Sequence, residues 1–156
     1  MQFITDINLG RLAVRLRMLG FDTIFYRGTA DRNFLRIAQQ ENRVVLTRKR
    51  ELAKRQFQGI LVVVESDRVE RQLEELLSKL NLKPQSDRYF TLCLRCNVPL
   101  QEILREDVVN RVPPYVYENY SRFMTCPRCG AIYWPGTHIE HARNWIRALR
   151  IPSRHP

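Results

Sequence analysis

Hydrophobic positions in the first half of the chain alternate between short continuous runs and stripes at helical spacing. Four runs have the length of buried strands and the β-branched or aromatic content that favours them. They are Phe3–Asp6, Thr23–Tyr26, Val44–Thr47 and Ile60–Val64. The sequence therefore predicts four strands, each closed by polar or charged residues.

Between these runs, apolar residues recur every three or four positions and predict helices. One stripe is Leu9, Leu12, Ala13, Leu16 and Leu19, ended by Gly20. A second helix is capped by Asp31 and ends near Asn42, a short third covers residues 51–55, and a fourth carries Val69 to Leu80. Alternation of strands and helices predicts an α/β fold with a mostly parallel sheet and helices on both faces.

The helical periodicity is lost in the segment "KPQSDR", residues 83–88, which we interpret as a linker. The expected organisation is an α/β domain over residues 1–85, a smaller domain over residues 89–145 and a basic tail over residues 146–156. No run approaches eighteen apolar residues and the N-terminus lacks a secretory pattern, so we expect a cytoplasmic protein without a membrane partner.

The formal net charge is +10, and both halves of the chain contribute to it. Residues 1–85 hold 16 basic and 10 acidic residues, and residues 86–156 hold 10 and 6. A positive field of this kind attracts polyanions, of which nucleic acid is the most abundant in the cytoplasm. An inert basic surface is the alternative reading.

All four cysteines lie in the second half as two Cys-x-x-Cys pairs, which are Cys93 with Cys96 and Cys126 with Cys129. Four thiolates at this spacing can surround one tetrahedral Zn²⁺, and a complete set of four leaves no open position for catalysis. The pattern predicts a structural zinc ribbon, with a redox pair or unmetallated thiols as alternatives. His138 and His141 follow the ribbon and are expected to pack on it or face RNA rather than bind metal.

Acidic residues are predicted to meet at one edge of the parallel sheet. Asp6 ends the first strand, Asp31 opens a helix that starts from the same edge, and Asp67 follows the last strand. Carboxylates are the ligands that Mg²⁺ and Mn²⁺ prefer, and such ions can activate water for phosphodiester cleavage. Asp31 and Asp67 are also good helix N-caps, so a purely structural reading remains open for each.

Basic residues accompany the acids at that edge. Arg48, Lys49 and Arg50 directly follow the third strand, and Arg11 and Arg15 lie off the apolar stripe of the first helix. Guanidinium and ammonium groups bind phosphate oxygens and position a nucleic acid backbone. These five residues are the predicted RNA-binding set.

The order of motifs resembles the Mut-seven C-terminal RNase family. The stretches that carry the resemblance are "FITDINLGRLAVRLRMLGFDTIFY", "DRNFLRIAQQENRVVLTR", "CLRCNVPL" and "RVPPYVYENYSRFMTCPRCGAIYWPGTHIEHARNW". It implies a PIN-like nuclease domain followed by a zinc ribbon, RNA as the substrate or ligand, and Mg²⁺ or Mn²⁺ held by a few acids. Asp6 and Asp31 match two of the family's acids, whereas Lys49 stands where a third acid is expected.

The functional hypotheses differ in the effect that they assign to Lys49. An ammonium group at this position repels a divalent ion but attracts phosphate. The leading hypothesis is a metal-dependent endoribonuclease using Asp6 and Asp31, with Asp67 as a third ligand. The alternative is a non-catalytic RNA-binding module that has lost its metal site, and an adaptor that binds proteins through the ribbon is a third hypothesis.

Overall fold

The computed structural model describes residues 1–149, which divide into two compact units. The first unit comprises residues 1–97 and the second residues 98–149. The first cysteine pair is therefore grouped with the α/β part of the chain. Most of the basic tail expected over residues 146–156 lies outside the described residues, and its first residues belong to the last helix.

The first unit is built on a four-stranded parallel sheet in the order β2-β1-β3-β4. Its strands are β1 (Phe3–Thr5), β2 (Thr23–Phe25), β3 (Val44–Thr47) and β4 (Leu61–Val63). In the centre of the sheet, Ile4 of β1 is in register with Ile24 and Val45. The predicted parallel sheet is confirmed, and the four strands end at one edge.

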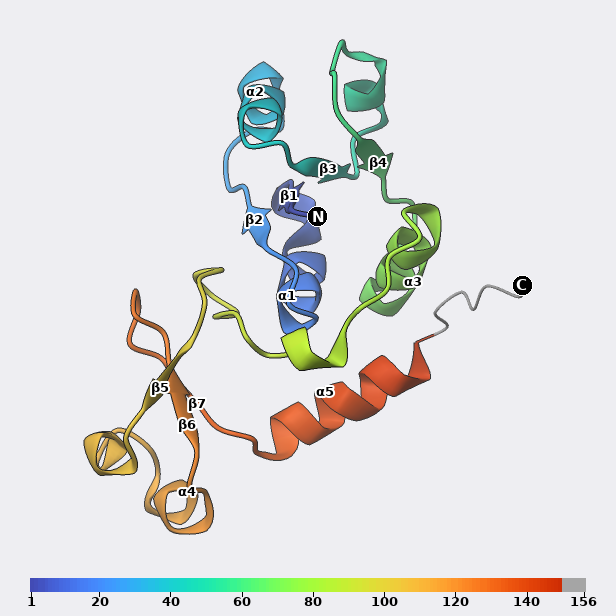
Figure 1. Cartoon of the computed structure of the whole chain (residues 1–156). Helices are drawn as coiled ribbons and strands as arrows, with labels where there is room; N and C mark the ends of the chain where they lie inside the picture. The colour runs from blue at the N-terminus through green and yellow to red at the C-terminus, as the bar shows by residue number, and fades with distance from the viewer. Residues whose placement is uncertain (150–156) are drawn as a thin grey trace. The chain divides into compact units, whose positions relative to one another are not determined.

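Helices cover both faces of this sheet (Figure 1). The helix α2 (Arg32–Gln40) and the 3-10 helix η2 (Arg50–Lys54) pack on one face, where Phe34 and Leu52 meet Ile4 and Val45 in a buried cluster. The helices α1 (Gly10–Met18) and α3 (Val69–Lys79) lie together on the other face. Side chains alternate along a strand, so Phe3 and Leu46 point toward this second face.

Two local features differ from the simple strand–helix pattern. The first helix begins with a 3-10 turn, η1 (Ile7–Leu9), before α1, and the short helix expected over residues 51–55 is the 3-10 helix η2. Gly20 has a φ of +81°, as expected for a residue that ends a helix, and a Cβ there would collide with the backbone oxygen of Arg88. The segment expected as a linker contains the 3-10 helix η3 (Ser86–Arg88) and packs closely on the end of α1.

The second unit contains a three-stranded antiparallel sheet, in the order β5-β6-β7. Its elements are β5 (Gln101–Ile103), the 3-10 helix η4 (Arg105–Val108), α4 (Pro114–Asn119), β6 (Phe123–Thr125), β7 (Ile132–Tyr133) and α5 (Thr137–Ala148). Val108, Val112, Val116 and Phe123 form its small buried core. Among the helices of residues 1–149, none is long and apolar enough to cross a bilayer.

Candidate functional site

Asp6 is fully buried at the edge where the strands end, and its carboxylate is held by three donors. Its Oδ1 accepts from the backbone N–H of Asn8 at 2.8 Å, which caps η1. Its Oδ2 accepts from the Thr47 hydroxyl at 2.7 Å and from the backbone N–H of Arg48 at 2.9 Å. An ionised carboxylate offers about four acceptor positions, so Asp6 has little remaining capacity for a ligand. It ties the end of β1 to the end of β3.

Asp31 and Asp67 have separate local roles. Asp31 is the N-cap of α2, where its Oδ1 accepts from the backbone N–H of Asn33 at 2.9 Å and of Phe34 at 3.3 Å. Asp67 does not cap α3, although its sequence position suggested this. Its carboxylate is 90% exposed and forms a 2.6 Å ion pair with Arg48.

These three acids therefore do not present a shared set of ligand atoms. Within the described part of the chain, the one group of three or more Cys, His or acidic residues close enough to share a metal ion is formed by cysteines. Asp6 is committed to three donors, Asp67 is paired with an arginine, and a cation follows β3. The residues at this edge fit Mg²⁺ or Mn²⁺ poorly.

Lys49 lines the same pocket as Asp6. This pocket, of about 310 Å³, is here called the Lys49 pocket. It is lined by Asp6, Ile7, Asn8, Arg27, Gly28, Thr29, Ala30 and Lys49. Within residues 1–149 the ammonium of Lys49 forms no hydrogen bond or ion pair, so it does not neutralise Asp6 or Asp31. The lysine is available to an anion that enters the pocket.

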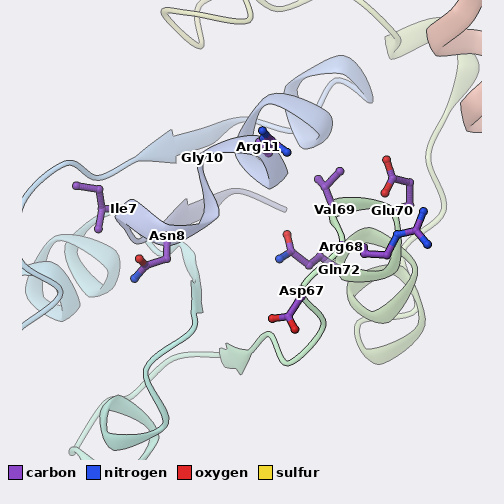
Figure 2. Close-up of a pocket in the computed structure, with 9 residues that line it drawn as sticks. All are labelled: Ile7, Asn8, Gly10, Arg11, Asp67, Arg68, Val69, Glu70 and Gln72. Atoms are coloured by element: carbon purple, nitrogen blue, oxygen red, sulfur yellow. The ribbon is translucent and has the colours of Figure 1, made fainter.

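A second pocket, of about 560 Å³, lies between the starts of α1 and α3 and is here called the Arg68 pocket (Figure 2). Its lining consists of Ile7, Asn8, Gly10, Arg11, Asp67, Arg68, Val69, Glu70 and Gln72. Figure 2 shows Arg11 on α1 and Arg68 at the start of α3. Neither arginine has a side-chain partner in the described residues. The pocket thus carries two unpaired cations, opposed by Glu70 and by an Asp67 that is already paired.

The predicted RNA-binding residues separate into two groups. Arg11 and Lys49 line pockets. Arg48 instead holds the loop after β4, because its guanidinium donates to the backbone oxygens of Glu65 and Ser66 as well as to Asp67. Arg50 forms an exposed 3.2 Å ion pair with Glu65, and the Arg15 guanidinium lies 3.6 Å from the Met18 sulfur. Neither Arg50 nor Arg15 lines one of the two pockets.

Sequence reasoning missed two of the cations that line the pockets, Arg27 and Arg68. Arg27 follows β2, and its guanidinium lies over the Phe25 ring at 5.3 Å from the centroid. Arg68 immediately precedes α3. Both follow strands of the same sheet, which is the signal that could have identified them.

The four cysteines come together as the sequence predicted. Their sulfur atoms all lie within 4.8 Å of one another. A tetrahedral ion with Zn–S bonds of about 2.3 Å places its sulfurs about 3.8 Å apart, so the donor set fits zinc. These residues could hold such a metal and would contribute four thiolates, which closes the coordination shell.

The two Cys-x-x-Cys turns have the same local geometry. The backbone N–H of Cys96 approaches the Cys93 sulfur at 3.4 Å, and that of Cys129 approaches the Cys126 sulfur at 3.5 Å. Each turn then closes on a residue with positive φ, at Asn97 in the first and Gly130 in the second. The two turns therefore present their sulfur atoms in the same way.

The first of these turns is anchored within the α/β unit. Arg17 is buried and donates to the backbone oxygens of Thr23 at 2.9 Å and Leu94 at 2.7 Å. The Asn97 amide donates to Asp22 Oδ1 at 2.6 Å and accepts from the backbone N–H of Thr23 at 2.8 Å. Burial acts to raise the pKa of Asp22, but hydrogen bonds from Arg43 and Asn97 outweigh it and lower the pKa.

His138 and His141 lie on α5 and are exposed. Neither belongs to the cysteine cluster or to another metal-binding group of the described residues. Their role stays a prediction.

A model of the Mut7-C RNAse domain family matches residues 1–146. The chain belongs to this family. The match covers both units, and so includes the edge around Asp6 and all four cysteines. No curated protein and no solved structure shows a significant match. Membership in the Mut7-C RNAse domain family makes this chain an RNA-acting, nuclease-like protein.

Proposed function

We propose that the chain binds RNA at the carboxyl edge of its parallel sheet, and that Lys49 replaces part of an acidic metal site by a phosphate-binding group. The observation that carries the proposal is the ammonium of Lys49 in the pocket beside Asp6, which has no partner among residues 1–149. In a ribonuclease family, this edge is where the RNA backbone is expected to lie. A cation there attracts phosphate directly, without a bridging metal ion.

The charge distribution supports the same proposal. Arg11 and Arg68 add two further cations close to the edge that are unpaired within the described part of the chain, and the whole chain carries a net charge of +10. Each phosphate that is neutralised releases condensed counterions, so binding of this type weakens as salt rises. The proposed setting is the cytoplasm, where thiols stay reduced and the cysteines can hold structural zinc.

Binding of labelled single-stranded RNA, measured without added divalent ions and again in Mg²⁺, tests this proposal. We expect binding without Mg²⁺, no gain of affinity when Mg²⁺ is added, and a steep loss of affinity between about 50 and 200 mM salt, because added cations compete for the phosphates. Lys49→Ala should weaken binding, whereas Lys54→Ala, an exposed lysine of η2 outside the pocket, should not. Binding that requires Mg²⁺, or that ignores salt, would contradict the proposal.

The second candidate function is metal-dependent endoribonuclease activity of a PIN-like domain. The observation in its favour is Asp6, a buried carboxylate at a strand end in an RNAse family. Asp6, Asp31 and Asp67 would be the metal ligands. As they are arranged, these acids fit a divalent ion poorly.

Cleavage assays in Mn²⁺ separate the two candidates. We expect the wild-type protein to bind RNA and leave it intact. Lys49→Asp removes a repelling charge and adds an anionic ligand, so it is the variant in which metal binding is most favoured. Wild-type cleavage that is abolished by Asp6→Asn would establish the second candidate and overturn the first.

A further inference from the structure

The two basic pockets share one wall. Ile7 and Asn8, in the turn between β1 and α1, line both the Lys49 pocket and the Arg68 pocket. The side chains of Ile7 and Asn8 point in different directions from this turn (Figure 2). We call this turn the Ile7–Asn8 divider. A ligand that occupies both pockets must pass over it.

Each pocket offers positive charge that no side chain of residues 1–149 neutralises by an ion pair. Lys49 serves the first pocket, and Arg11 and Arg68 serve the second, all without side-chain partners in the described residues. Arg27 adds a fourth cation above Phe25. The acids that line the pockets are Asp6, which is saturated by donors, Asp67, which is paired with Arg48, and Glu70. The cations outnumber the uncommitted acids, so both pockets favour an anion.

The divider carries an exposed apolar side chain. The Ile7 side chain is 56% exposed, although it is a large hydrophobic residue beside two charged pockets. Proteins that bind unpaired nucleic acid combine a cationic track for the backbone with side chains that contact the bases, most often aromatic ones. Ile7 is an aliphatic side chain in a corresponding position, between two pockets lined by cations, where it can pack against a base or sugar.

We propose that an unpaired RNA strand crosses the Ile7–Asn8 divider, with phosphates in the Lys49 and Arg68 pockets and a base or sugar against Ile7. This inference rests on the proposed function and specifies its substrate as single-stranded RNA. A single strand can bend over a protruding side chain because its backbone torsions are independent. A duplex holds its phosphates on a stiff helix, with the base faces stacked inside and unavailable to Ile7.

The test compares one RNA strand, alone and annealed to its complement, against matched variants. Arg68→Gln and Arg11→Gln should each reduce the slope of log affinity against log salt by about 0.7, the value for one lost contact with a single strand. Arg71→Gln is the control, because this exposed arginine lies in the first turn of α3, close to Arg68 in sequence, and does not line the pocket. Circular dichroism establishes that each variant is folded.

The Ile7 contact has a different signature. Ile7→Ala should lower the affinity for the single strand about fivefold, with an unchanged salt slope, because an apolar contact releases no counterions. Its effect on duplex binding should be small. The inference is overturned if RNA binds with a steep salt dependence but the Arg68, Arg11 and Ile7 variants behave like Arg71→Gln. It is also overturned if the duplex binds better than the single strand. In either case the proposed function stands. If the wild type binds no RNA, both fail.

Discussion

At the scale of single residues, Asn97 has the most demanding set of roles. It takes a φ of +60° to close the first Cys-x-x-Cys turn, and its side-chain amide joins that turn to Asp22 and Thr23. A positive φ is unfavourable for most residues, and asparagine tolerates it better than alanine does. The amide also keeps a backbone N–H and a carboxylate satisfied in a partly buried position.

Replacing Asn97 by alanine should therefore destabilise the protein by about 2–3 kcal/mol, because two hydrogen bonds are lost, one of them to a charged group. The measurement is the free energy of unfolding in urea. Asn81→Ala is the matched control, since Asn81 also has a positive φ of 49° but lies exposed at the end of α3. Equal losses in the two variants would show that the Asn97 side chain contributes nothing beyond its backbone conformation.

At the scale of elements, the loop between β4 and α3 is held from both sides. Arg48 donates to its carbonyl oxygens, while the Glu75 carboxylate of α3 accepts from the backbone N–H groups of Glu65 and Ser66. Gln72 adds a bond to the Ser66 oxygen at 2.9 Å. This loop carries Asp67 and Arg68 into the Arg68 pocket, so its order determines the shape of that pocket.

Glu75 makes this loop sensitive to acid. Burial acts to raise the pKa of Glu75, but hydrogen bonds from Lys79, Ser66 and Glu65 outweigh it, and the pKa lies below its ordinary value. Ionised Glu75 thus stabilises the folded state above the ordinary pKa near 4.5, and this contribution is lost as pH falls through the lowered pKa.

We expect Glu75→Gln to be less stable than the wild type by about 1–2 kcal/mol at neutral pH, and the gap to narrow in acid below the lowered pKa. Urea unfolding at a series of pH values measures the gap. Glu51→Gln, which removes an exposed carboxylate from η2, controls for the change in net charge. If the difference in unfolding free energy between the two proteins stayed constant as the pH fell below the lowered pKa, Glu75 ionisation would not stabilise the loop.

At the scale of the whole molecule, the small second unit depends on more than its hydrophobic core. That core is formed by a few valines and Phe123, in a unit that spans residues 98–149. Units of this size commonly need a metal or disulfides for stability. The cysteine cluster supplies the donors for such a metal.

The purified protein should therefore contain about one equivalent of zinc, and Cys126→Ser should lose the metal together with the fold of the second unit. Elemental analysis and circular dichroism measure the two effects. His138→Ala is the control, because this exposed histidine lies near the ribbon in sequence and outside the cluster, and it should keep its zinc. Less than half an equivalent in fresh wild-type protein would rule out a zinc site.

Local patterns in the sequence were enough to determine several features of this protein. Continuous apolar runs and helical stripes fixed the parallel sheet and its helices, because side-chain periodicity follows from backbone geometry. The spacing within each cysteine pair determined its turn for the same reason. Asp6 could be placed at a strand end because it follows the run that forms β1, and Lys49 could be placed just after β3.

Only the tertiary structure decided what these residues contact. The hydrogen bonds from Thr47 and Arg48 occupy Asp6, and the guanidinium of Arg48 engages Asp67 rather than a phosphate. Arg68 enters a pocket because α3 packs beside α1. These partners lie far apart along the chain, and no periodicity records which donor meets which acceptor. Side-chain chemistry at the edge of the sheet is set by the packing of distant segments, and among the described residues that packing leaves more cations than uncommitted acids in the two pockets.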